Sequence, residues 1–143
     1  MLLRNLAVLF LIAGFIFSGC DQQQQKEKEK EDDAISEEFK EIEKESRDLI
    51  DDIENASYEE KGKLEVRMEN FVDKVETKLG KSEREGLDAE TNKIMNNLEE
   101  QKNKIENDLE DFKNATEDNW ENVKSDIKSD FQKFQVKVKE LFE

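Results

Sequence analysis

Residues 87–141 read LDAETNKIMNNLEEQKNKIENDLEDFKNATEDNWENVKSDIKSDFQKFQVKVKEL, and one side of this stretch repeats every three or four positions. The repeat averages about 3.6 residues a step, which is the period of an α-helix. A strict heptad would average about 3.5 residues, so little supercoiling is expected. The members of this stripe are Leu87, Thr91, Ile94, Leu98, Gln101, Ile105, Leu109, Phe112, Thr116, Trp120, Val123, Ile127, Phe131, Phe134, Val138 and Leu141.

The preceding region has the same helical spacing and predicts a first helical arm. The fold class is therefore predicted to be all-α. We expect residues 34–143 to form a long amphipathic helical hairpin or a small antiparallel coiled-coil-like bundle. The stripe of the first arm consists of Ile35, Phe39, Ile42, Leu49, Ile53, Leu64, Met68, Phe71, Val75 and Leu79.

A bend between the two arms is predicted near residues 80–83. Gly80 is the residue type that commonly ends a helix, because it tolerates the left-handed C-cap conformation. Ser82 and Glu85 have the spacing of a capping box, in which each residue bonds the backbone of the other.

Two further breaks are predicted inside the arms. Ser57 and Glu60 match a second capping box, which predicts a break near residues 55–57. The segment Asn114-Ala115-Thr116 precedes acidic residues, as expected at the positive end of a helix. A break near residues 114–116 would divide the second arm in two.

The composition of the chain excludes several classes of protein. The formal net charge is −15 at pH 7, and the chain contains no proline. Leu, Ile, Val and Phe make up only about a fifth of the residues from Cys20 onward, so a large core is excluded. Nucleic-acid binding is excluded because no basic patch would neutralise phosphates. Direct binding to lipid is disfavoured because anionic headgroups would repel most of the surface.

Residues 21–33, DQQQQKEKEKEDD, contain no apolar side chain. Such a segment has nothing to bury, so we expect residues 20–33 to be a polar tether that is disordered or only partly helical. An N-terminal helical extension is the alternative, because Gln, Lys and Glu all tolerate a helix.

The residue types that perform most enzyme chemistry are missing. The chain has no histidine, and Cys20 is its only cysteine, so a general base, a thiol nucleophile and soft metal ligands are lacking. We therefore predict that the protein is not an enzyme and that it has no catalytic residues, cofactor site, metal site or small-molecule substrate. Two acidic clusters are candidates for weak calcium binding, but they lack the spacing of an EF-hand and are expected to be solvated surface: Asp108, Glu110 and Asp111, and Glu117, Asp118 and Glu121.

The last segment of the chain is the most aromatic, with Trp120, Phe131, Phe134 and Phe142. These side chains could form a face that docks a partner or touches lipid. We favour the interpretation that they anchor the helices against residues such as Phe39 and Phe71.

Residues 1–19 have the pattern of an export signal. Arg4 precedes an apolar run over residues 6–17, which is shorter than the roughly 20 residues needed to span a bilayer. The run ends in Phe17-Ser18-Gly19-Cys20, which resembles the lipobox of bacterial lipoproteins, with Phe17 where leucine is usual.

This resemblance implies that the signal is cut before Cys20 and that Cys20 carries the lipid. Several acyl chains, such as palmitate, would hold the protein firmly at a membrane, because each buried methylene adds roughly 0.8 kcal/mol. The protein would then lie in the bacterial cell envelope, exposed to the periplasm or at the cell surface. Asp21 resembles the inner-membrane retention signal of enteric bacteria, whereas other phyla interpret this position differently, so both membranes stay open.

The segment Ala115-Thr116-Glu117-Asp118-Asn119-Trp120-Glu121-Asn122-Val123-Lys124 is similar to a small bacterial coiled-coil family named for a cyanobacterial stress-response protein. The family resemblance implies an acidic helical hairpin with a role in stress and without catalytic residues. The lipoprotein signal departs from the pattern of that family.

These observations predict a non-enzymatic, lipid-anchored helical protein that acts as a scaffold, spacer or partner-binding module of the envelope. A thin apolar stripe left exposed by a hairpin would favour self-association or a partner helix. The alternative is a conditionally folded protectant or a lipid-surface-binding amphipathic helix protein.

Overall fold

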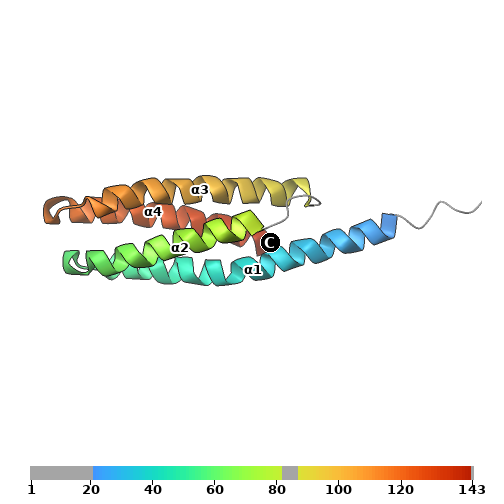
Figure 1. Cartoon of the computed structure of the whole chain (residues 1–143), viewed down its shortest axis with the longest axis horizontal. Helices are drawn as coiled ribbons and strands as arrows, with labels where there is room; N and C mark the ends of the chain where they lie inside the picture. Colours follow the sequence, from blue (N-terminus) through green and yellow to red (C-terminus); the bar gives the residue numbers. More distant parts are fainter. Residues whose placement is uncertain (1–20, 82–86, 143) are drawn as a thin grey trace, which may run out of the picture.

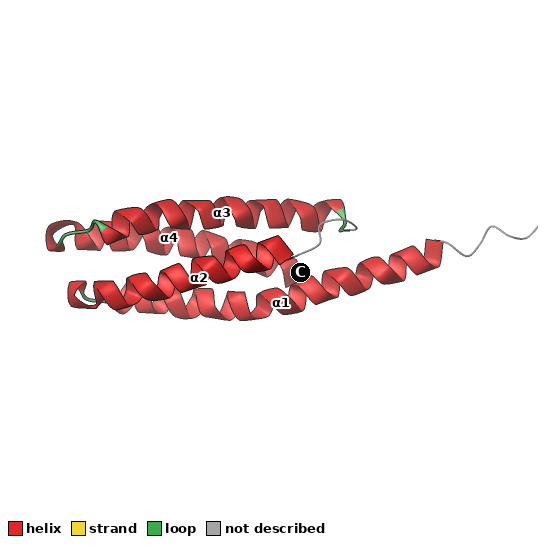
Figure 2. Ribbon diagram, viewed as in Figure 1, coloured by secondary structure: helices red, strands yellow, loops and turns green. Residues whose placement is uncertain are grey.

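A computed structural model of the chain describes residues 21–81 and 87–142, and 93% of this part is helical, with no strand among the described residues. The all-α prediction is therefore confirmed (Figure 2). The elements are α1 (Asp21–Asn55), the 3-10 turn η1 (Tyr58–Glu60), α2 (Lys61–Lys81), α3 (Ala89–Lys113), the 3-10 turn η2 (Glu117–Asn119), α4 (Trp120–Lys139) and the 3-10 turn η3 (Glu140–Phe142).

The four helices form an antiparallel bundle. Helix α1 packs against α2 and α4, and α3 packs against the same two helices, so each helix occupies one corner (Figure 1). Of the two predicted arrangements, the bundle is the one observed. The second arm is not a single rod, because the chain reverses between α3 and α4 (Figure 1).

Each helix contributes one apolar stripe to a shared core. The buried side chains of the stripes form a single cluster along the bundle axis. Met95, which is fully buried, takes the place predicted for Ile94, which is only partly buried. The least exposed large side chains are Phe39, Ile42, Leu49, Ile53, Met68, Phe71, Met95, Leu98, Ile105, Phe112, Phe131 and Phe134.

The turns after α1 and α3 have the same construction. Asn55 and Asn114 each donate a side-chain hydrogen bond to the carbonyl four residues earlier, at 2.7 and 2.9 Å. The backbone N–H of Ser57 then donates to the Glu60 carboxylate at 3.0 Å, and that of Thr116 donates to Asn119 Oδ1 at 2.7 Å. These side-chain bonds satisfy backbone groups that a helix end would leave unpaired.

This likeness extends along both hairpins, α1–α2 and α3–α4, because equivalent positions lie 59 residues apart in the sequence. The chain therefore contains a repeated helical hairpin, and its two copies share one core. Buried pairs at this spacing are Ile50 and Leu109, Ile53 and Phe112, Ala56 and Ala115, Met68 and Ile127, Val72 and Phe131, Val75 and Phe134, and Leu79 and Val138.

The predicted tether needs correction, because the backbone of residues 21–33 is helical and continuous with the rest of α1. The physical reason is that Gln, Glu and Lys are good helix formers and that the core-packed part of α1 supplies the helix nucleus. Helix α1 runs past the end of the bundle as a result (Figure 1).

The predicted bend near residues 80–83 lies partly outside the described residues, which resume at Leu87. Gly80 is not a C-cap, because α2 continues through it to Lys81. Among the helices that the structure describes, none is both long and apolar enough to cross a bilayer.

Replacing Phe71 by alanine is expected to lower the free energy of unfolding by about 3–5 kcal/mol, because it leaves a cavity in the core. The ring of Phe71 lies 5.3 Å from that of Phe131 and 5.4 Å from that of Phe134. Urea unfolding of residues 20–143 measures the change. Val66 is 55% exposed on the same helix, so Val66→Ala is expected to cost less than about 0.5 kcal/mol. Equal effects of the two substitutions would contradict the packing.

Candidate functional site

The α1–α2 and α3–α4 turns lie together at one end of the bundle, opposite the end past which α1 extends (Figure 1). We call residues 55–61 and 114–120 the turn end. Trp120 is its centre and is only 3% exposed. Its ring meets that of Tyr58 edge to face at 5.9 Å and that of Phe112 at 5.0 Å. Because Tyr58 and Phe112 belong to different hairpins, the aromatic contacts join the two copies.

The carbonyl of Ala115 in one turn accepts hydrogen bonds from the other hairpin. Lys61 Nζ donates to it at 2.8 Å and also to the carbonyl of Lys113 at 2.5 Å, while the Tyr58 hydroxyl donates to Ala115 at 3.4 Å. Carbonyls at a helix C-terminus have no partner within the helix and carry partial negative charge, so a lysine suits this position.

The carbonyl of Ala56 is satisfied in the reciprocal way. Trp120 Nε1 donates to it at 3.4 Å and Lys124 Nζ at 3.3 Å, both from α4. Each turn thus provides an alanine carbonyl as acceptor, and the opposite hairpin provides a lysine and an aromatic residue as donors. The turn end is therefore a lock between the hairpins.

The aromatic residues of the last segment are placed mainly in the core, as favoured from the sequence. Trp120, Phe131 and Phe134 are buried, and both phenylalanines contact Phe71. Phe142 in η3 is the exception, with 37% of its surface exposed. A docking face made of these four aromatics is not present.

A second region is a groove between α3 and α4. Its cavity of about 220 Å³ is lined by Asp108, Asp111, Asn114, Asn119, Val123 and Asp126. Three of these groups are carboxylates on two adjacent helices. Of the predicted acidic clusters, the structure brings Asp108 and Asp111 to this groove and leaves Glu110 exposed. In the described part of the chain, no group of three His, Cys, Asp or Glu side chains is arranged to hold a metal ion.

Asp108 on α3 is hydrogen-bonded to Asp130 on α4. Burial, followed by this hydrogen bond, raises the pKa of Asp108 to about 6. Burial also acts to raise the pKa of Asp130, but the hydrogen bonds from Lys133 and Asp108 outweigh it, and the pKa of Asp130 is lowered. Sequence reasoning did not pair these residues; the 59-residue repeat is the signal that would have marked them as unusual.

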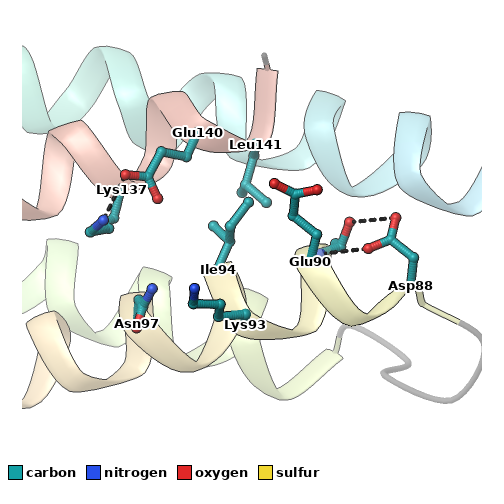
Figure 3. A pocket seen from close by; sticks show the side chains of 9 residues that line it. Asp88, Glu90, Lys93, Ile94, Asn97, Lys137, Glu140 and Leu141 are labelled. Carbon is teal, nitrogen blue, oxygen red and sulfur yellow. Dashed lines mark hydrogen bonds and ion pairs between the residues drawn. The ribbon is translucent and has the colours of Figure 1, made fainter.

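A third region lies at the opposite end of the bundle, between the start of α3 and the end of α4 with η3. A cavity of about 550 Å³ has Ile94 and Leu141 at its centre (Figure 3). Two interactions lie on its polar rim: Lys137 pairs with Glu140 at 2.6 Å, and Asp88 accepts the Thr91 N–H at 2.7 Å as the cap of α3 (Figure 3). These groups stabilise helix ends.

Cys20, the predicted lipidation site, lies outside the described residues. Comparison with protein-family models, with curated proteins and with solved structures gives no match. The two resemblances drawn from the sequence therefore stay predictions.

The substitution Lys61→Met is expected to lower the free energy of unfolding by about 1 kcal/mol, because the hydrogen bonds to the carbonyls of Lys113 and Ala115 are lost while the aliphatic stem is kept. Thermal or urea unfolding measures the change. Lys63→Met is the matched control, because Lys63 is exposed on the same helix. A loss of stability in the control as large as that in Lys61→Met would refute the lock.

Proposed function

We propose that this protein is a lipid-anchored, non-enzymatic spacer of the bacterial cell envelope, exposed to the periplasm or at the cell surface. The observation that carries the proposal is the continuity of α1, which joins the bundle to the residue after Cys20 without a break. A lipid on Cys20 would thus be connected to a folded body through helix.

The dimensions of α1 support a spacer. Its 35 residues correspond to a length of about 50 Å at the rise of an α-helix. The part before Ile35, the first buried core residue, accounts for about 20 Å of this length. The turn end lies at the far end of α1 from Asp21, so it would reach farthest from the anchored membrane (Figure 1).

The burial of the apolar stripes changes which partners are expected. Self-association or a partner helix was expected because a hairpin would leave its stripe exposed. In the bundle the stripes are buried within one chain, and within residues 35–81 and 87–142 the large apolar side chains that remain exposed are Val66, Val136 and Phe142. That reason no longer holds, so we propose a monomer whose partners bind its charged surface. A role in stress, suggested by the coiled-coil resemblance, is compatible with such a spacer.

The closed core also favours the spacer over a conditionally folded protectant or lipid-surface binder. A protein that folds only on lipid keeps an apolar face available to it, as surface-lying helices do. Here that face is already covered by neighbouring helices.

The position of the turn end above a membrane tests the proposal. A fluorescent donor is attached to Ser57→Cys or to Lys139→Cys in the lipidated protein, and an acceptor is placed in the vesicle surface. Lys139 closes α4 at the end nearer to Asp21. We expect a distance of about 50 Å or more for position 57 and about half of that for position 139.

Two controls make this experiment decisive. Cys20→Ser should abolish membrane attachment, whereas attachment without the thiol would exclude the lipid anchor. A Gly-Pro pair at positions 28 and 29 should break α1 and broaden the distance from position 57. Equal short distances from both labels in the unbroken protein would show that the bundle lies flat and is not a spacer.

Residues 20–143 without lipid are expected to sediment as a monomer across the micromolar range, because the apolar stripes of the four described helices already cover one another. Analytical ultracentrifugation measures the mass. A concentration-dependent dimer in that range would restore self-association as the leading interpretation.

A further inference from the structure

The two hairpins differ sharply in how their helices meet. In the first hairpin, opposite charges join α1 to α2: Arg67 pairs with Asp52, and Lys74 bonds Glu45 at 2.5 Å and Glu41 at 3.2 Å. In the second hairpin, two carboxyl groups meet across the α3–α4 groove instead, those of Asp108 and Asp130. Opposed like charges disfavour the contact of two helices unless a proton lies between them.

The repeat shows that the fold does not require carboxyl groups at these positions. Asp108 is equivalent to Leu49, and Asp130 is equivalent to Phe71, at the spacing of 59 residues. Leu49 and Phe71 are each 1% exposed and belong to the core of the bundle. In the first hairpin these positions are therefore held by buried apolar side chains.

A second pair of positions in the groove also differs in charge between the two hairpins. Asp111 is equivalent to Asp52, and Asp126 is equivalent to Arg67, so the ion pair of the first hairpin is replaced by two carboxylates. The two aspartates line the same cavity as Asp108. The second hairpin thus differs from the first at two neighbouring pairs of positions, and both differences bring acidic groups together.

The charged groups around the pair come from the same two helices. On α3 they are Lys104 and Asp111, and on α4 they are Asp126 and Lys133. Lys133 bonds Asp130 at 2.5 Å, which keeps Asp130 ionised. Lys133 thus neutralises the carboxylate of Asp130, and the carboxyl group of Asp108 can hold the proton.

We propose that Asp108 and Asp130 form a proton-linked clasp that fastens α3 to α4 in mild acid and loosens this contact as the solution becomes more alkaline. With the proton bound, the Asp108 hydroxyl donates to the Asp130 carboxylate. When the proton leaves to water, two carboxylates face each other beside Asp111 and Asp126. The raised pKa of Asp108 agrees with this arrangement.

The sign of the pH dependence follows from the direction of that shift. The pKa of Asp108 in the folded protein, about 6, lies above the ordinary value of an aspartate, so the folded state binds this proton more tightly. The stabilisation is fully present below the unfolded pKa of about 4 and is lost as the pH rises through 6. The stabilisation by the clasp therefore falls as the pH rises between these two values.

The first test is a titration of the individual aspartate carboxyl groups by carbon NMR in the full-length protein in micelles. We expect the Asp108 resonance to titrate near pH 6, about two pH units above an exposed aspartate. Asp130→Asn should move that midpoint to lower pH, because the carboxylate that accepts the proton bond is gone. An Asp108 midpoint near 4 in the unaltered protein would overturn the proposal, whatever the fate of the variants.

The second test compares melting temperatures at pH 5 and pH 7. In Asp108→Asn the rise in melting temperature on acidification should be at most half of that in the unaltered protein. Asp111→Asn changes the net charge by the same amount in the same groove and should keep most of the rise. If both variants behave alike, the effect comes from general relief of negative charge, and the clasp is excluded.

Discussion

Every helix of this protein has a narrow apolar stripe, and burying that stripe requires neighbouring helices to cover it. Helix α1 is covered by α2 and α4, and α3 is covered by the same pair, so removing any helix would expose the stripes of its two neighbours. Because each stripe holds few large side chains, the aromatic residues carry much of the contact: Phe71, Phe131 and Phe134 meet near the middle of the bundle, and Trp120 closes one end. The charged side chains on the rest of each helix lie at the surface, in contact with water.

The repeated hairpin explains how a chain with so few apolar residues satisfies the backbone carbonyls at the turn end. Each turn leaves an alanine carbonyl without a partner in its helix, and the opposite hairpin supplies a lysine and an aromatic donor to it. The arrangement is reciprocal because the two turns have the same construction. The repeat also provides an internal reference: Asp108 and Asp130 stand where the first hairpin has two buried apolar residues, Leu49 and Phe71.

Much of the local structure could be predicted from the sequence, because helical period and cap residues are local signals. The turns after α1 and α3 lie at the segments where breaks were expected, and Ser57 bonds Glu60 as a capping box requires. The disorder expected for residues 21–33 is not observed, because α1 begins at Asp21. The absence of apolar side chains indicated disorder, but these residues have high helix propensity and continue a helix that is already packed in the core. The choice between hairpin and bundle stayed open, because the local pattern of Asn114-Ala115-Thr116 is compatible with a kink as well as with a reversal.

The sequence by itself determined the helices, the acidic surface and most of the residues that face inward, since a period of about 3.6 residues places them on one side. Only the tertiary structure decided which sides meet. The contacts of Trp120 with the Ala56 carbonyl and of Asp108 with Asp130 join residues on different helices. Such contacts depend on the rotation and alignment of packed helices, which the interlocking of core side chains sets.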